Sequence, residues 1–220
     1  MNMSNETNAV MKNITNKAGT GKKMNYGVRF TTMTAMLSAI AFILMYLEIP
    51  LPMIMPDFIK FDFSDLPALI GTFAFGPVSG VIICLIKNLL HLMVSKSMFV
   101  GELSNFILGC AFVIPAGLIY HFKKTKTGGL LSGLVAALVM GIVSVFSNYF
   151  VVYPVYYKAG MAEEAILQMY QAIAPSMKSV LQCLICFNLP FTIVKGLISV
   201  AICMVFYKPI SLVLKGRDNR

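Results

Sequence analysis

Long apolar segments that carry few charges constrain this chain more than any other feature. Of its 220 residues, 58% are hydrophobic and 12% are charged, and the mean hydropathy is +0.78. A soluble domain averages about 45–50% apolar and about 25% charged residues. The excess apolar surface must therefore meet lipid, and we expect a single-domain, all-α integral membrane protein.

Six apolar segments are candidates for membrane spans. They cover residues 31–47, 66–75, 78–94, 101–120, 128–155 and 181–207. The second segment is far shorter than the about 17–25 residues that a span needs. Either it is a short sixth span, or it joins the third segment in one kinked helix and leaves five spans. In the first case the long, proline-rich loop 48–65 is a candidate cover for its outer end.

The distribution of basic residues separates these two alternatives. Lysine and arginine collect on the cytoplasmic side of membrane proteins. Six spans put twelve of them on the side of both termini and four on the other, whereas five spans put eight on each side. The pattern predicts six transmembrane helices with both termini inside (N-in/C-in). Because the basic residues lie at the ends of apolar segments, the net charge of +9 does not indicate a nucleic-acid partner.

Three regions differ in composition. Residues 1–25 are polar, rich in asparagine and basic, which is typical of a disordered tail, here on the cytoplasmic side. Residues 26–214 contain the apolar segments and are expected to form the six-helix membrane domain. Residues 215–220 form a short basic C-terminal tail.

The sixth segment carries a polar face in an otherwise apolar sequence. Its residues recur at helical spacing and are Asn188, Thr192, Lys195 and Ser199. Lys195 lies far from both ends of the segment, and an ionisable side chain at such depth usually faces the protein interior or a cavity. Two roles fit it: binding a ligand, or locking the helices together through a helix carbonyl or Glu102.

Other intramembrane polar residues fall in the same outer half when six spans are drawn. They are Lys87, Asn88 and His91 in the third segment, Glu102 and Asn105 in the fourth, and Asn148 in the fifth. An apolar cavity with a few polar anchors is what a small-molecule site requires. Amides and hydroxyls suit a neutral, hydroxyl-bearing or heteroaromatic ligand. Four tyrosines end the fifth segment, as an interfacial belt or as ligand contacts.

The sequence contains no Walker A, H-E-x-x-H or G-x-S-x-G motif. We therefore expect a binding protein that is not an enzyme and that has no catalytic residue, no metal site and no ATPase of its own. In the inner half, Ala35 and Ala39 form an A-x-x-x-A pattern, which allows two helices to approach closely.

Three stretches resemble a known family. FSDLPALIG at 63–71 and FGPVSG at 75–80 are similar to the second and third helices of energy-coupling factor (ECF) S-components. PFTIVKG at 190–196 is similar to the sixth helix of their riboflavin-specific branch, and the resemblance extends over roughly 30–214.

The resemblance implies six helices, a first loop folded over the vitamin and a site open to the outside of a bacterial plasma membrane. It implies riboflavin as the transported ligand, no cofactor, and a partner module of a membrane T-subunit and two cytoplasmic ATPases. Ala35 and Ala39 match the face that meets the T-subunit. Lys195 matches a ligand-binding lysine and Asn148 a ligand-binding asparagine, whereas Thr192 stands where riboflavin binders often have asparagine.

Three other interpretations remain. The chain is an S-component for another vitamin or a nucleobase, a membrane-embedded enzyme using Lys87, His91 and Glu102, or a structural membrane scaffold.

Overall fold

The computed structural model describes residues 26–56, 59–95, 99–158 and 160–215, with side chains as far as Phe206. The predicted tail 1–25 and residues 216–220 of the predicted C-terminal tail lie outside the described residues. The chain divides into two units, Met1–Thr32 and Met33–Arg220. The described part of the first unit is a regular helix. In it, the hydroxyls of Thr31 and Thr32 donate to backbone carbonyls one turn earlier in the chain.

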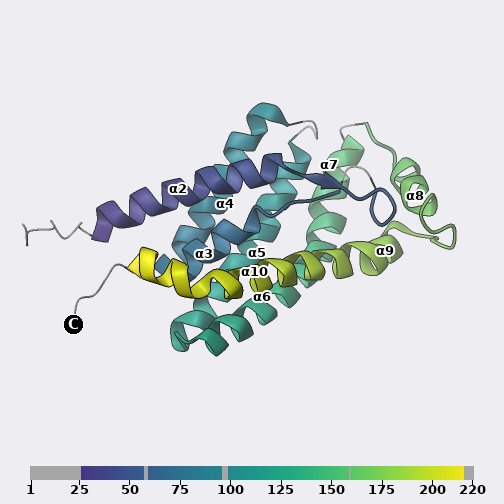
Figure 1. Ribbon diagram of the computed structural model, residues 1–220. Helices are drawn as coiled ribbons and strands as arrows, with labels where there is room; N and C mark the ends of the chain where they lie inside the picture. Colours follow the sequence, from purple (N-terminus) through teal and green to yellow (C-terminus); the bar gives the residue numbers. More distant parts are fainter. Residues whose placement is uncertain (1–25, 57–58, 96–98, 159, 216–220) are drawn as a thin grey trace, which may run out of the picture. The chain divides into compact units, whose positions relative to one another are not determined.

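The second unit is built almost entirely of helices (Figure 1). Five helical stretches of the described chain are long and apolar enough to cross a membrane, which makes this a multi-pass membrane protein: Tyr26–Tyr46, Pro77–Val94, Val100–Phe122, Lys126–Lys158 and Val180–Phe206. The elements are α2 (Tyr26–Tyr46), β1 (Ile49–Pro50), β2 (Lys60–Phe61), α3 (Asp65–Phe75), α4 (Pro77–His91), η1 (Leu92–Val94), α5 (Val100–Phe122), α6 (Lys126–Ser147), η2 (Asn148–Val152), α7 (Tyr153–Lys158), α8 (Glu163–Gln171), α9 (Val180–Cys183), η3 (Leu184–Asn188) and α10 (Leu189–Lys215).

The short apolar segment α3 and the helix α4 are separate helices, not one kinked helix. Gly76 between them has φ +94°, a conformation that favours glycine, and Pro77 opens α4. Gly80 of α4 then lies against Thr72 of α3. Contacts between residues on either side of Gly76 require α4 to run back along α3, so the kinked-helix alternative is wrong.

Two π-helical turns interrupt the fifth and sixth apolar segments. The turn η2 lies between α6 and α7, and η3 lies between α9 and α10. Such turns displace the helix register locally and are frequent at functional sites. Each contains one of the asparagines singled out above, Asn148 at the start of η2 and Asn188 at the end of η3.

The loop between α2 and α3 contains the strands of the described chain. β1 and β2 pair antiparallel, with Ile49 opposite Phe61 and Pro50 opposite Lys60. The chain is mostly helical, as expected, and this two-residue ladder is a local feature that supplies backbone hydrogen bonds within the loop.

Small residues let α6 and α10 pack closely side by side. Gly133 lies against Val200, Gly141 against Ile193, and Gly196 of α10 against Ala137. Close approach of backbones compensates for the absence of a hydrophobic driving force between helices in lipid. The core beside them contains side chains from α3, α4, α5, α6 and α10. Its buried residues include Leu69, Ile83, Phe112, Val113 and Met140.

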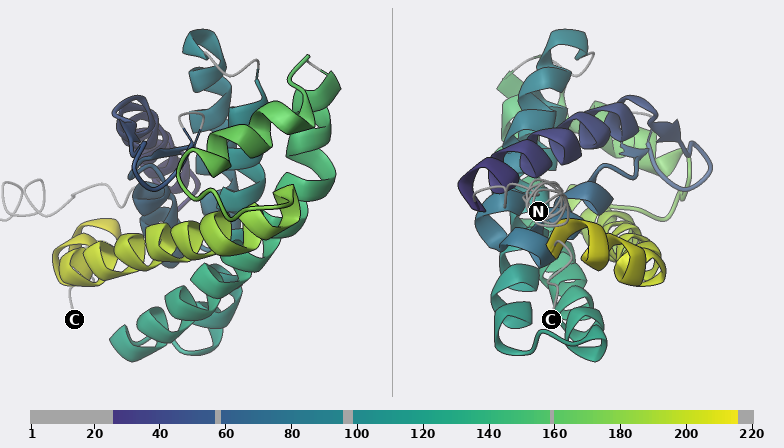
Figure 2. Two further views of the ribbon diagram at one scale, coloured as in Figure 1. Left: turned by 90° about the vertical axis from the view of Figure 1, so that its right-hand side faces the viewer. Right: turned by 60° about the vertical axis from the view of Figure 1, so that its left-hand side comes forward.

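The turn that joins α5 to α6 and the segment α7–α8 lie at opposite ends of the second unit (Figure 2). The first end carries the exposed Lys123 and Lys124. The other end contains a second buried cluster, in which α8 packs against α7, α9 and η3 through Tyr153, Ile166, Tyr170 and Leu184.

Candidate functional site: a small-molecule cavity

A cavity of about 930 Å³ lies within the second unit. Small-molecule sites have volumes of about 300–1,000 Å³ and are lined mostly by apolar side chains with a few polar groups. The apolar lining includes Met45, Met55, Leu108, Met140 and Phe191. The cavity is therefore large enough for a ligand with several rings or a long polar chain.

The loop between α2 and α3 forms part of the wall. Glu48, Met55, Ile59, Lys60 and Asp62 line the cavity, and Lys60 forms an ion pair with Glu48 at the β1–β2 ladder. The sequence predicts this loop as a cover for α3. The structure places it against the ligand cavity as well.

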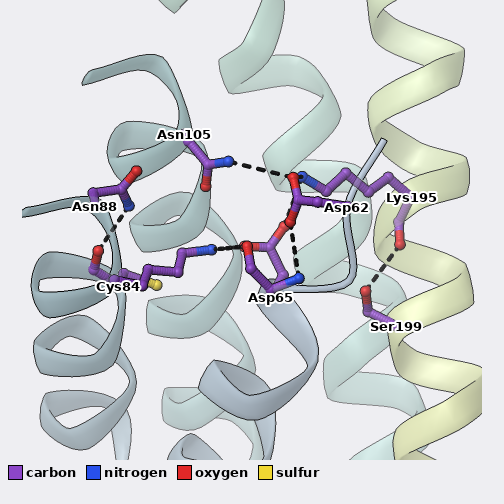
Figure 3. A network of polar contacts seen from close by, with 9 residues as sticks. Asp62, Asp65, Cys84, Asn88, Asn105, Lys195 and Ser199 are labelled. Atoms are coloured by element: carbon purple, nitrogen blue, oxygen red, sulfur yellow. Dashed lines mark hydrogen bonds and ion pairs between the residues drawn. The ribbon is translucent and has the colours of Figure 1, made fainter. Parts of the chain in front are cut away.

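Lys195 reaches the cavity from α10 and binds two carboxylates (Figure 3). Its Nζ donates to Asp62 Oδ2 at 2.8 Å and lies 3.3 Å from Asp65 Oδ2. The partner suggested by the sequence, Glu102, is not the one found. Because an ammonium carries three N–H donors, Lys195 can hold both carboxylates and still offer a donor to a ligand.

A second buried lysine completes the charge network. Lys87 of α4 donates to Asp65 Oδ1 at 2.7 Å and to Ser64 Oγ at 2.6 Å. Two lysines and two aspartates thus meet with zero net formal charge. Buried charges persist when paired and hydrogen-bonded, and this network joins the loop, α3, α4 and α10.

Asp62 is the member of this network that lies in the loop. Burial, the largest single influence, would raise the pKa of its carboxyl, but the ammonium groups of Lys195 and Lys87 and the hydrogen bond from Lys195 together hold the pKa below the usual value. A lowered pKa in the folded state means that the ion pair stabilises the fold at neutral pH, and that this stability is lost as the pH falls through the lowered pKa.

Amides and a hydroxyl line the same cavity as Lys195. Asn148 accepts from Ser104 Oγ at 3.4 Å, and Asn105 Nδ2 lies 3.5 Å from Asp62 Oδ2. Asn188 and Thr192 lie on the predicted polar face of the last apolar segment. All of these asparagines and Thr192 line the cavity, as does Lys195.

Two of the polar residues emphasised by the sequence lie elsewhere. Asn88 does not line the cavity, because its amide donates to Cys84 O of its own helix at 2.7 Å. Ser199, the last residue of the polar face, donates to Lys195 O at 3.1 Å. Both side chains satisfy local backbone groups instead of facing the cavity.

The tyrosines that end the fifth apolar segment fall into two groups. Tyr153 and Tyr156 are buried and line the cavity. Tyr149 is 43% exposed and Tyr157 is partly buried, and neither lines the cavity. Contact with a ligand is therefore possible for Tyr153 and Tyr156, whereas Tyr149 and Tyr157 fit an interfacial belt.

The three residues proposed for an enzymatic reaction do not share one site. His91 Nδ1 and Glu102 Oε1 lie 2.8 Å apart at the cavity wall. Lys87 does not line the cavity and is held by Asp65 and Ser64. His91 and Glu102 can offer hydrogen bonds to a bound molecule, and Lys87 is held apart from them in the charge network.

A multi-pass membrane protein with a cavity that combines apolar walls and polar groups belongs to the class of small-molecule binding or transport proteins. Residues 28–207 match the family described as ECF transporter, substrate-specific component. The chain belongs to this family, so it is a transporter component and not an enzyme.

Relatives and a solved structure agree with this family. The chain is 37% identical over 182 residues to riboflavin transporter RibU of Staphylococcus aureus (strain TCH60), with 82% of this chain and 89% of the relative covered. It is 32% identical over 185 residues to riboflavin transporter FmnP of Bacillus subtilis (strain 168), with 82% and 92% covered. A solved structure of the S component of a bacterial ECF transporter superposes with a TM-score of 0.67 at 33% identity, covering 85% of this chain and 98% of that one.

Proposed function

We propose that this chain is the riboflavin-capturing S subunit of an ECF-type uptake transporter in the plasma membrane of a bacterium. The observation that carries the proposal is the cavity, whose apolar lining is interrupted by amides, hydroxyls, the Lys195 ammonium and other charged groups that include the Asp62 carboxylate. Flavin has a flat ring with carbonyl and ring-nitrogen acceptors and a chain of hydroxyls. Apolar walls suit the ring, and the polar groups suit its acceptors and hydroxyls. Relatives named as riboflavin transporters support this ligand.

Five residues are proposed to bind the ligand directly. They are Asn105, Asn148, Asn188, Thr192 and Lys195. Thr192 can donate and accept through its hydroxyl, so it can replace the asparagine that the family resemblance leads one to expect there. Asn88 is proposed only to support α4, because its amide is turned toward its own helix.

A fluorescence titration tests this function. Riboflavin added to the purified chain in detergent should lose its fluorescence saturably, at one flavin per chain. Unlabelled thiamine, biotin and adenine should not displace it. Absence of saturable flavin quenching, together with saturable binding of one of these compounds, would assign the chain to a different vitamin or a nucleobase.

The proposed topology has six spans, with α3 as the short second one and both termini in the cytoplasm. The α3–α4 hairpin and the twelve-to-four charge distribution support it. In this topology the cavity, whose lining includes Tyr153 and Tyr156 of α7, faces the outside.

Cysteine labelling tests this topology. In a background without native cysteines, a cysteine at Lys158 should react with a membrane-impermeant maleimide in intact cells. A cysteine at Lys124 should react only after permeabilisation. Both lysines are exposed, so burial would not prevent reaction. Labelling of position 124 in intact cells would contradict the proposed orientation.

The chain is proposed to work with a membrane T-subunit and two cytoplasmic ATPases. The described part of α2 supports this, because Ala35 and Ala39 lie on its exposed side together with Met36, Ile40 and Ile43. The opposite side of the helix is buried through Thr34, Ser38 and Ala41. An exposed stripe that combines small and apolar residues can receive another membrane helix.

A further inference from the structure

Three buried side chains form a hydrogen-bonded chain that ends at the cavity. The hydroxyl oxygens of Tyr153 and Tyr170 are 2.8 Å apart, and Tyr170 donates to Asn188 Oδ1 at 2.5 Å. The exposed fractions of the three residues are 1%, 0% and 3%. A tyrosine has one hydroxyl hydrogen. Because Tyr170 gives it to Asn188, Tyr153 must be the donor to Tyr170.

Tyr170 itself does not line the cavity. It lies on α8, outside the membrane-spanning stretches, and packs in the second buried cluster with its ring 5.6 Å from that of Phe187. Its hydroxyl therefore acts on a bound molecule through its partners Asn188 and Tyr153, which both line the cavity.

The contact with Tyr170 decides which end of the Asn188 amide faces the ligand. The two ends have nearly the same shape, so hydrogen-bond partners determine their orientation. Here the oxygen accepts from Tyr170, so Nδ2 is the end of the amide that can donate to another group. Because Asn188 lines the cavity, a bound molecule can accept from it.

We propose that Tyr170, supported by Tyr153, is a positioning residue that commits Asn188 to donate to an acceptor atom of the ligand, a carbonyl oxygen or a ring nitrogen. This inference rests on the proposed function and adds a specificity determinant from α8. Without the Tyr170 hydroxyl, the amide can turn by 180° and present its oxygen, which repels an acceptor.

Tyr170→Phe tests this role through the dissociation constant for riboflavin. Loss of one hydrogen bond that orients a donor should weaken binding by about two- to tenfold. The matched control is Tyr149→Phe, which removes the hydroxyl of an exposed tyrosine outside the cavity lining. Its affinity should equal that of the unmodified chain.

A double-mutant cycle separates positioning from a general structural effect. Asn188→Leu should itself weaken binding, and Tyr170→Phe added to it should cause no further loss, because the amide through which Tyr170 acts is absent. Because the double variant also deprives the Tyr153 hydroxyl of its partner, Tyr153→Phe is added to both variants of this comparison. Replacing buried polar partners together by apolar groups of the same shape can be nearly neutral for stability. The comparison of Asn188→Leu with Asn188→Leu/Tyr170→Phe therefore remains available even if Tyr170→Phe alone does not fold.

The outcomes are distinct. Equal losses in the Asn188→Leu variant and the double variant support the positioning role. Additive losses, or an unchanged dissociation constant in Tyr170→Phe, overturn it while leaving the riboflavin function intact. Absence of riboflavin binding by the unmodified chain would instead overturn the proposed function, and this inference with it.

Discussion

Lys195→Met is expected to weaken riboflavin binding by roughly ten- to a hundredfold. The substitution keeps the length of the side chain and removes its charged donors. A hydrogen bond from a charged group contributes about 1.5–3 kcal/mol, and each 1.4 kcal/mol corresponds to a factor of ten in affinity. Flavin fluorescence quenching measures the effect on the dissociation constant.

The same substitution should also lower the melting temperature of the ligand-free protein. It leaves Asp62 buried without the ammonium that lies 2.8 Å from it, and removing one partner of a buried ion pair costs about 3–5 kcal/mol. Considered from the sequence alone, the loss of a buried lysine charge predicts an equally or more stable helix. The observed pairing with Asp62 and Asp65 reverses that expectation.

A matched double variant separates binding from stability. Asp62→Asn/Lys195→Met removes the unpaired carboxylate charge, so its melting temperature should recover toward that of the unmodified chain. Its affinity for riboflavin should stay low. If affinity returned together with stability, Lys195 would have only a structural role, and ligand binding would depend on Asn148, Asn188 and Thr192.

Ala39→Trp, and to a similar extent Ala35→Trp, should abolish most ATP-driven riboflavin uptake. Both alanines lie on the exposed side of α2, and a tryptophan there would prevent close approach of a partner helix. Overpacking a tight contact costs about 1–3 kcal/mol, or roughly a five- to hundredfold weaker assembly. Uptake into proteoliposomes that contain the complete transporter measures it.

Binding by these variants should be unchanged, because from α2 only Met45 and Tyr46 line the cavity. The control is Leu138→Trp, which places the same bulk on an exposed apolar position of α6. It should leave both binding and uptake intact. Normal uptake by Ala39→Trp, or loss of binding with normal partner assembly, would contradict a partner surface on this side of α2.

Hydropathy predicts most of the helices because a membrane span needs a long apolar segment. The segment 101–120 corresponds to α5, Val100–Phe122, and 181–207 to the stretch Val180–Phe206. The helix α8 is not predicted, since it is short and amphipathic and no apolar run reveals it. The two strands are also missed, because two residues are too few to show an alternating pattern.

The sequence predicts the site residues only where they recur at helical spacing along one helix. The spacing of Asn188, Thr192 and Lys195 predicts a shared polar face, and all three residues line the cavity. The partner of Lys195 is not predictable in this way, since Asp62 lies 133 residues away in a loop. A useful signal is nevertheless present: two buried lysines require carboxylates nearby, and the chain has nine acidic residues in all.

The contribution of α8 has a similar explanation. Tyr170 meets Asn188 because the segment between α7 and α9 folds back onto η3. Neither residue type nor spacing indicates such a contact between elements. The π-helical turns that carry Asn148 and Asn188 likewise have no recognisable pattern in the sequence.

The most direct measurement of the central claim is the absorption spectrum of the purified protein after incubation with riboflavin and gel filtration. Retained flavin should give its visible absorption bands at one equivalent per chain, and acid should release unmodified riboflavin identifiable by mass spectrometry. A colourless, correctly folded protein after this treatment would contradict the assignment of riboflavin as its ligand.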